Sequence, residues 1–208
     1  MKNFETIPDC KVTLVGDSGV GKSSIIGRYI SGIFIADGMS SSGANYSQKI
    51  YEKNNKKVRL NIWDTAGQEK FRSLGRNFYK DAFIICIIFD ITNKQTFNNV
   101  KEIWYPEIQK YGEKYNILSL VGNKCDLYED EEVEENDINS FAEEIGGNYF
   151  LVSAKNGNGI EEMFKTLAKM YLNPNFKDRL EESRSTRGNS VKLDKNIIKN
   201  KNKRDICC

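Results

Sequence analysis

A segment of eight residues, from Gly16 to Ser23, carries the clearest chemistry of this 208-residue sequence. It reads GDSGVGKS, which matches the pattern GxxxxGK followed by Ser or Thr, and it lies between a predicted strand and a predicted helix. Glycines let backbone N–H groups turn inward around a phosphate, and a helix N-terminus adds partial positive charge. The pattern predicts a nucleoside triphosphate site, in which Lys22 reaches the β- and γ-phosphates and the Ser23 hydroxyl binds Mg²⁺. The expected contacts in this segment are Ser18, Gly19, Val20, Gly21, Lys22, Ser23 and Ser24.

Two later motifs indicate which base is bound. The residues NKCD at 123–126 follow an apolar segment, and the carboxylate of Asp126 can accept hydrogen bonds from N1–H and the 2-amino group of guanine. Adenine offers no such pair of donors, so ATP would leave Asp126 unpaired. The residues SAK at 153–155, after the next apolar segment, supply a second loop near the base. Each motif alone is a weak signal, but in order after the phosphate loop they favour guanine over the ATP of a metabolic kinase. The expected base contacts are Asn123, Lys124, Asp126, Ser153, Ala154 and Lys155.

The residues DTAGQE at 64–69 follow another apolar segment and suit metal binding and hydrolysis. Asp64 is placed to hold Mg²⁺ through water, as the acid of a Walker B motif does. The backbone N–H of Gly67 can reach a γ-phosphate, and the side chain of Gln68 can orient an attacking water without acting as a strong base. Lys22, Gly67 and Gln68 are therefore the predicted catalytic groups.

These motifs need a scaffold that brings the ends of distant segments together. Short apolar segments alternate with segments of helical period through residue 172, and several apolar segments lack a polar face, as parallel strands covered by helices do. The short linker 53–57 favours an antiparallel hairpin at the sheet edge. We expect an α/β domain with a doubly wound, mostly parallel six-stranded sheet, one antiparallel edge strand, and ligands at the carboxyl ends of the strands. The predicted strands are 12–15, 46–52, 58–63, 83–89, 117–121 and 149–152, and the predicted helices are 22–30, 96–111, 134–145 and 160–172.

The composition divides the chain into two parts. Residues 1–172, the predicted nucleotide-binding domain, carry 21 Lys/Arg against 24 Asp/Glu, whereas residues 173–208 carry ten against five. The basic tail is poor in apolar residues and is expected to be disordered, because it cannot bury enough surface to offset its ordering entropy. The absence of His excludes Ser-His catalysis. The acidic body argues against a nucleic-acid partner, and we expect a monomer.

Together these motifs resemble those of the Ras superfamily of small GTPases, and within it the Rab family, over roughly residues 9–172. The resemblance implies the small G-protein form of the P-loop NTPase fold. It also implies a switch that binds GTP or GDP with Mg²⁺, recruits effectors in the GTP state, hydrolyses GTP slowly and regulates vesicle and membrane trafficking. Segments similar to Rab signatures are RLNIW at 59–63, KFRSL at 70–74, FYKDA at 78–82 and FDIT at 89–92.

The resemblance assigns roles to four aromatic residues. It implies that Phe34 stacks on the guanine, and that three others form the surface that Rab effectors read. Core packing explains those three equally well, and both roles can belong to one residue. The three are Tyr46, Trp63 and Phe78.

The first switch region departs from the family pattern. It reads GMSSSGANY at 38–46, where Rabs usually have a TIGVDF-like stretch, and counting from Lys22 places Ser41 at the position of the switch threonine. A serine keeps the hydroxyl for Mg²⁺ but loses the β-methyl that restricts χ1, so we expect this loop to close less firmly on GTP. The alternative function is therefore a GDP-biased or nucleotide-insensitive membrane scaffold, against which Gln68 argues. The predicted metal groups are Ser23, Ser41 and Asp64.

The sequence ends in Cys207 and Cys208 after a basic segment, a pattern that resembles the double-prenylation site of Rabs. Two lipid chains anchor a protein stably where one does so marginally, and nearby Lys and Arg add attraction to anionic lipid. The expected location is the cytoplasmic face of an intracellular membrane, cycling with the cytosol. The resemblance implies an exchange factor, an activating protein that accelerates hydrolysis, a Rab escort or GDI-type chaperone, and GTP-state effectors as partners.

Overall fold

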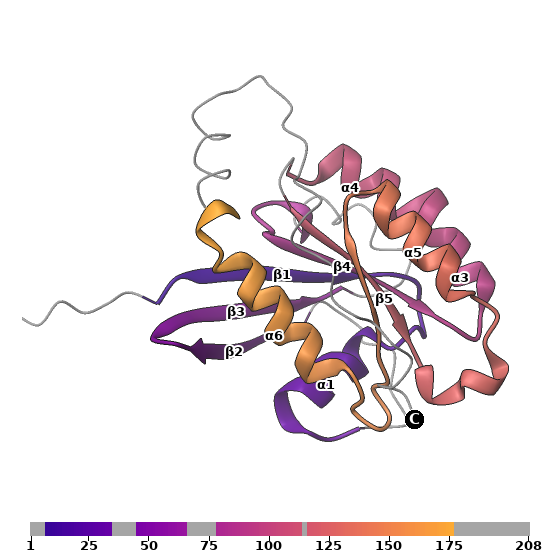
Figure 1. Ribbon diagram of the computed structural model, residues 1–208, viewed down its shortest axis with the longest axis horizontal. Helices are drawn as coiled ribbons and strands as arrows, with labels where there is room; N and C mark the ends of the chain where they lie inside the picture. Colours follow the sequence, from indigo (N-terminus) through magenta and orange to yellow (C-terminus); the bar gives the residue numbers. More distant parts are fainter. Residues whose placement is uncertain (1–6, 35–44, 66–77, 114–115, 177–208) are drawn as a thin grey trace, which may run out of the picture.

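The computed structural model describes residues 7–34, 45–65, 78–113 and 116–176 (Figure 1). Six strands form one sheet in the order β2-β3-β1-β4-β5-β6, and every neighbouring pair is parallel except β2 with β3. The predicted α/β fold, with its mostly parallel six-stranded sheet and one antiparallel edge strand, is thus confirmed. The strands are β1 (Asp9–Val15), β2 (Asn45–Lys53), β3 (Lys56–Asp64), β4 (Ile84–Asp90), β5 (Ile117–Asn123) and β6 (Asn148–Leu151).

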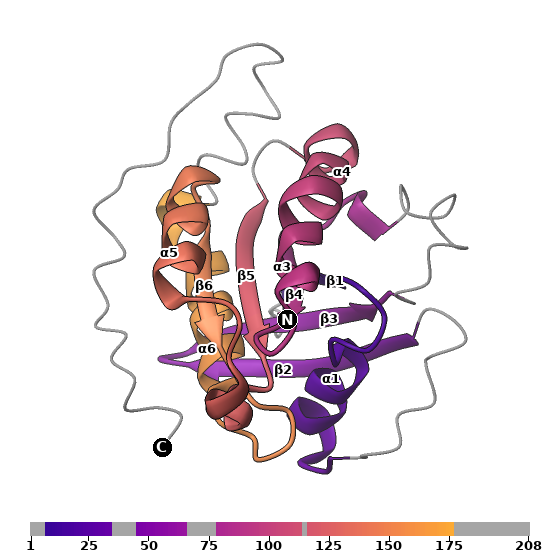
Figure 2. The same cartoon turned by 90° about the vertical axis from the view of Figure 1, so that its right-hand side faces the viewer.

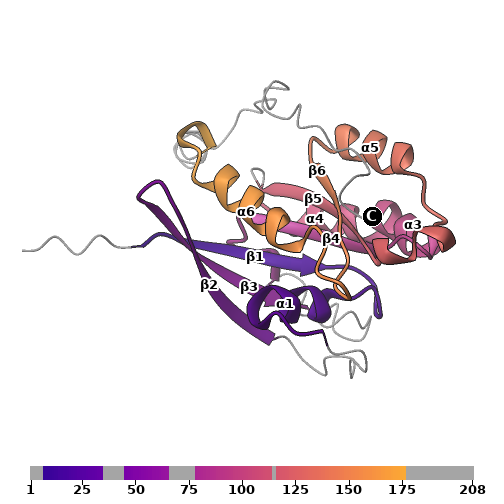
Figure 3. The ribbon, with the colours of Figure 1, turned by 60° about the horizontal axis from the view of Figure 1, so that its bottom comes forward.

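The antiparallel pair results from a two-residue turn. Lys53 of β2 lies opposite Lys56 of β3, and the intervening Asn54 and Asn55 have φ values of 51° and 57°. A turn with two left-handed residues matches the twist of the flanking strands, and Asn tolerates that conformation better than most residues. The hairpin forms one edge of the sheet, and β5 and β6 form the other (Figure 3).

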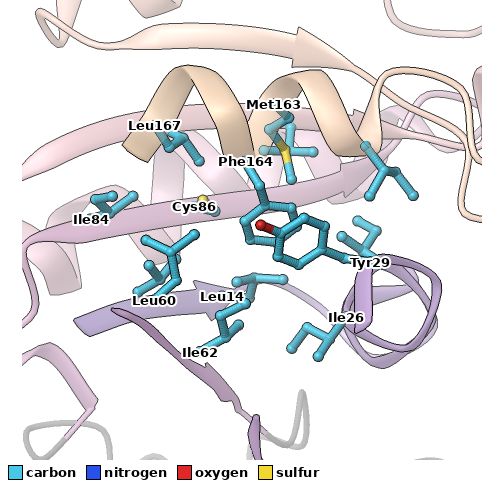
Figure 4. Packing of buried hydrophobic residues seen from close by; sticks show 14 of the residues in the cluster. Leu14, Ile26, Tyr29, Leu60, Ile62, Ile84, Cys86, Met163, Phe164 and Leu167 are labelled. Carbon is cyan, nitrogen blue, oxygen red and sulfur yellow. The ribbon is translucent and has the colours of Figure 1, made fainter. Parts of the chain in front are cut away.

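Helices cover both faces of the sheet. Helices α1 and α6 pack on one face, where the rings of Tyr29 and Phe164 stack with centroids 3.9 Å apart (Figure 4). Side chains of α3 and α5 pack on the other face, where Phe97 contacts Phe89 of β4. All seven residues of β4 are buried, as expected for a central strand covered on both sides. The helical segments are α1 (Lys22–Ser31), α3 (Lys94–Asn99), η2 (Val100–Trp104), α4 (Tyr105–Tyr111), η3 (Cys125–Asp130), α5 (Glu135–Glu144) and α6 (Ile160–Tyr171).

The predicted helix 96–111 differs from the observed one in its interior. It begins two residues earlier and contains a π-helical turn, η2, between α3 and α4, although the three segments follow one another as one continuous rod (Figure 1). The η3 segment was not predicted. It is a 3₁₀ helix that follows β5 directly.

The parallel direction of four strands brings the motif-bearing loops to one edge of the sheet, although the sheet is twisted. In Figure 2, β2 and β3 run across the view while β5 runs up it. The parallel strands β1, β3, β4 and β5 still end at the same edge, and Asp90 at the end of β4 lies in register with Asn123 at the end of β5. The loops after these strands therefore meet, as the sequence predicted.

The predicted domain boundary at 172 lies close to the end of α6. Just beyond it, Phe176 packs with its ring centroid 6.3 Å from that of Tyr171. Within the described ranges, the helices are all too short or too polar to cross a membrane.

Candidate nucleotide-binding site

The loop between β1 and α1 is shaped by glycines that no other residue could replace. Gly16 has a φ of 143°, and a Cβ there would lie 2.2 Å from the carbonyl oxygen of Ile88. Gly21 has a φ of 98°, and its Cβ would lie 2.2 Å from Nδ2 of Asn123. The main chain of the loop thus passes directly against β4 and β5. This close approach is the geometry in which backbone N–H groups, rather than side chains, can surround a phosphate.

Lys22 begins α1 and is buried, with 5% of its surface exposed. Its ammonium donates hydrogen bonds to the carbonyl oxygens of Gly16, at 2.8 Å, and of Asp17, at 2.7 Å. Burial lowers the pKa of Lys22 to about 8, against the opposing effect of the carboxylates of Asp64 and Asp17. A cation held at this depth against neutral carbonyls would gain strongly from the negative charge of a phosphate.

The predicted metal groups Ser23 and Asp64 lie together. The hydroxyl of Ser23 donates to Oδ2 of Asp64 at 2.5 Å, across 41 residues of sequence. Among the described residues, none donates a hydrogen bond to the other carboxylate oxygen, Oδ1, although it is buried. Burial raises the pKa of the Asp64 carboxyl, while the Ser23 hydrogen bond and then Lys22 act to lower it. A hydroxyl oxygen beside a carboxylate oxygen without a donor fits Mg²⁺, which prefers oxygen ligands.

Asn123 connects the phosphate loop to the loop at 153–155. It is buried at the end of β5; its Nδ2 donates to the carbonyl oxygen of Val20 at 2.8 Å, and its Oδ1 accepts from the backbone N–H of Ala154 at 3.1 Å. Both partners are main-chain atoms, so Asn123 fixes the backbone of two loops that lie 134 residues apart at these contacts. The asparagine of the NKCD motif therefore positions the backbone of both loops.

Asp126 is oriented by the same loop at 153–155. Its Oδ1 accepts a hydrogen bond from the hydroxyl of Ser153 at 2.5 Å, and its Oδ2 lies 3.8 Å from Nζ of Lys155. The side chain of Lys155 is 66% exposed, so this ion pair is weak. The carboxylate of Asp126 is held in one orientation, as a group that recognises a base by paired hydrogen bonds needs to be.

Two charged residues of the site were not predicted from the sequence. Asp90 ends β4, and its Oδ2 lies 2.5 Å from Nζ of Lys124, while its Oδ1 accepts from the backbone and hydroxyl of Thr92. Arg28 of α1 donates to the carbonyl oxygens of Ala154, Lys155 and Gly32. Asp90 lay within a segment that resembles Rabs, but Arg28 had no signal, because backbone carbonyl groups are invisible in a sequence.

Phe34, which the resemblance places on the guanine, lies beside this arginine. The guanidinium of Arg28 is 6.0 Å from the centre of the Phe34 ring, within the range of a cation–π interaction. Arg28 thus contacts both the Phe34 ring and the loop at 153–155. The structure brings these two predicted elements of the base pocket together.

The aromatic residues predicted as an effector surface occupy adjacent strands. The rings of Tyr46 and Trp63 meet edge to face with centroids 5.2 Å apart, and Tyr46 is 51% exposed. Thr13, which pairs with Trp63, donates from its hydroxyl to the carbonyl oxygen of Phe78 at 3.0 Å. Because Tyr46 is exposed, a role in a contact surface explains its position better than core packing alone. Its hydroxyl donates to Oδ1 of Asn61.

Five predicted site residues lie outside the described residues, so their roles stay predictions. They are Ser41, Gly67, Gln68, Cys207 and Cys208.

Comparison with known proteins agrees with the nucleotide-binding site that this geometry indicates. A family model described as the Ras family matches residues 11–173. The chain is similar to the Ras-related protein Rab-26 of Rattus norvegicus, with 41% identity over 160 residues, 76% of this chain and 62% of that protein. It is also similar to the Ras-related protein RIC1 of Oryza sativa subsp. japonica, with 39% identity over 158 residues, 76% of this chain and 78% of that protein. A third relative is the Ras-related protein RABD2c of Arabidopsis thaliana, with 38% identity over 157 residues, 76% of this chain and 77% of that protein.

The chain belongs to the Ras family. The predicted resemblance to Rab small GTPases is confirmed by the names and identities of these relatives. Small GTPases of the Ras and Rab families hydrolyse GTP, bind guanine nucleotides and generally do so with Mg²⁺. The chain spans less than two thirds of the length of rat Rab-26.

Proposed function

We propose that this protein is a guanine-nucleotide switch that binds GTP and GDP with Mg²⁺ and hydrolyses GTP slowly. The observation that carries the proposal is Asn123, whose buried side chain ties the phosphate loop at Val20 to the base loop at Ala154. A ligand that has both phosphates and a base would span these two loops, and it would bind best if they are held at a fixed separation. The oriented carboxylate of Asp126 then favours guanine over adenine.

Each group has a defined task in this proposal. Lys22 donates to two carbonyl groups of its own loop, which it would exchange for phosphate oxygens. The neighbouring Ser23 and Asp64 would hold Mg²⁺, Ser23 directly and Asp64 through water. A bound Mg²⁺ would supply positive charge beside the charge that develops on the phosphates. By resemblance, Ser41 would add a hydroxyl to the metal, Gly67 would contact the γ-phosphate and Gln68 would orient the attacking water. A partner protein would supply the remaining positive charge, worth about 10³–10⁵ in rate.

The proposed output is binding rather than catalysis. In the GTP state effectors would read a surface that includes Tyr46, Trp63 and Phe78, and hydrolysis would reset it. We place this cycle at the cytoplasmic face of an intracellular membrane in vesicle trafficking, with exchange factor, activating protein and GDI-type chaperone as regulators. Lipidation of Cys207 and Cys208 would provide the anchor.

The first experiment measures the affinity of the purified protein for GDP, for a non-hydrolysable GTP analogue and for ATP, in the presence of Mg²⁺. We expect affinities for GDP and the analogue within about tenfold of each other, a difference below ~1.4 kcal/mol, and no competition by ATP. An analogue bound about a hundredfold more weakly than GDP would instead favour the GDP-biased scaffold, because Ser41 would then fail to support the triphosphate state.

Two variants test hydrolysis and anchoring separately. Gln68→Leu should abolish the acceleration of GTP hydrolysis by a Rab-type activating protein while leaving GDP affinity unchanged, since the side chain acts only on the water. Replacing Cys207 and Cys208 by Ser should release the protein from membranes to the cytosol. Unchanged membrane recovery of the double Ser variant would refute the lipid anchor and leave the nucleotide switch standing.

A further inference from the structure

The phosphate loop contains a carboxylate, Asp17, which the chemistry of an anion site does not explain. The oxygen Oδ1 of Asp17 accepts a hydrogen bond from the indole N–H of Trp104 at 2.8 Å, and Oδ2 accepts from Nδ2 of Asn99 at 2.7 Å. Both carboxylate oxygens are therefore held by the helical rod α3–η2–α4, which covers one face of the sheet. Negative charge in a loop that binds phosphates is unfavourable unless it is kept away from them.

The helical rod is shaped to present both donors to one carboxylate. Asn99 and Trp104 are five positions apart, which on a regular α-helix places them about 140° apart around the axis. The π-helical turn lies between them, with the N–H of Tyr105 bonded to the carbonyl oxygen of Val100. A π turn has more residues per turn, so it reduces the angle between positions five apart, and such turns are frequent at functional sites.

The amide of Asn99 is itself oriented so that it can donate to Asp17. Its Oδ1 accepts a hydrogen bond from Nε2 of Gln95 at 2.9 Å, which leaves Nδ2 to donate to Asp17. The backbone of Asp17 is held as well, through its carbonyl oxygen, by the ammonium of Lys22. Asp17 is thus fixed at both its main chain and its side chain.

We propose that Asn99 and Trp104 are positioning residues that hold the charge of Asp17 away from the nucleotide phosphates. The inference rests on the proposed nucleotide function and adds a requirement to it. The two donors stabilise the phosphate loop in a form that receives an anion, and without them the carboxylate would turn and repel the phosphates. Removing the charge of Asp17 should therefore remove the need for its donors.

The test is a double-mutant cycle on the dissociation constant for GDP with Mg²⁺, using the full chain. W104F removes the N–H and keeps an aromatic ring, and we expect it to weaken GDP binding about tenfold. D17A alone should change affinity much less, and W104F should have no further effect in the D17A background. N99A and the N99A/D17A pair form a second cycle, which serves if W104F fails to fold. N139A, an exposed helical amide change on α5, is the matched control and should leave GDP affinity unchanged.

Salt dependence separates charge repulsion from a packing defect. The loss caused by W104F should shrink as KCl is raised from about 0.05 M to about 0.5 M, because repulsion between charges is screened and packing is not. An equal loss in the wild-type and D17A backgrounds, or a loss that is independent of salt, would overturn the inference and leave GDP binding by the wild-type chain intact. A wild-type chain that binds no guanine nucleotide would overturn the proposed function and this inference together.

Discussion

The two halves of the nucleotide site differ in how their polar groups are satisfied. On the base side, Asn123 and Asp126 already make their hydrogen bonds within the chain, to Val20, Ala154 and Ser153. On the phosphate side, Lys22 is bonded to two carbonyl groups of its own loop, and among the described residues no donor reaches Oδ1 of Asp64. The base side is therefore organised before any ligand arrives, whereas the phosphate side holds groups whose best partners belong to the ligand.

This difference has an energetic consequence. A buried polar group without a partner costs roughly 1–3 kcal/mol, and more if it is charged. The phosphate side thus lowers the stability of the nucleotide-free protein. Because the ligand supplies the missing partners, the same free energy adds to the affinity for the nucleotide. Substitutions on the base side should lower nucleotide affinity and specificity. Substitutions on the phosphate side should lower nucleotide affinity and raise the stability of the nucleotide-free protein.

The largest effect is expected on the base side, from Asp126→Asn. The replacement offers guanine a donor where it needs an acceptor, so GDP affinity should fall by about 10³–10⁴. Xanthosine diphosphate, which presents a carbonyl at the same edge, should gain affinity. Competition between the two nucleotides measures this change in base preference, and Asn139→Ala is the control. Equal loss for both would show that Asp126 acts through folding and not through the base.

Lys22→Met should weaken GDP binding yet stabilise the nucleotide-free protein, by about 2–3 kcal/mol at pH 7. The ammonium has an ordinary pKa of 10.5, which burial lowers to about 8, so folding disfavours the charged form. The penalty is complete below pH 8 and fades as the pH rises to 10.5, with the wild type gaining up to about 1.4 kcal/mol per pH unit. Urea unfolding in EDTA between pH 7 and 10 should show the advantage of the variant shrinking. A constant advantage would mean that packing, and not charge, is responsible.

Asp64→Asn should weaken Mg²⁺ binding to the GDP complex by about 10–100-fold, as is usual when a group that holds a metal through water is lost. The measurement is the GDP dissociation rate as a function of Mg²⁺ concentration. In EDTA the variant and the wild type should release GDP at similar rates. A variant that is faster in EDTA as well would place Asp64 in the structure of the loop rather than at the metal.

The smallest effect is expected from Lys155→Ala. Its ammonium lies 3.8 Å from Asp126 and its side chain is 66% exposed, so the pair is weak. We expect GDP affinity to fall by less than about tenfold. A loss as large as that of Asp126→Asn would show that Lys155 contacts the nucleotide directly, and the base side would then depend on its ligand as the phosphate side does.

The parts of the site that the sequence predicted are those that follow from strand order. Ser23 meets Asp64, and Asn123 meets the phosphate loop, because the carboxyl ends of parallel strands share one edge of the sheet. A motif at the end of a strand is therefore placed in space by the fold class alone. The predicted strands and helices agree with the observed ones to within a few residues for the same reason.

The parts that were missed depend on a local change in helical geometry or on main-chain atoms. Arg28 acts on three carbonyl groups, which leave no trace in a sequence. Trp104, which contacts Asp17, belongs to a π turn, and the one extra residue of such a turn is not visible in a hydrophobic period. The catalytic role of Gln68 remains a prediction from its motif.

The hairpin turn at Asn54 and Asn55 is a suitable site for attaching a label. Strand β3 runs parallel to β1, so its first residue and the turn before it lie at the edge of the sheet opposite to the nucleotide loops. The turn residues and their neighbours from Glu52 to Lys57 are exposed. A fluorophore or a short peptide tag inserted there would report the position of the protein in a cell while leaving the nucleotide pocket untouched.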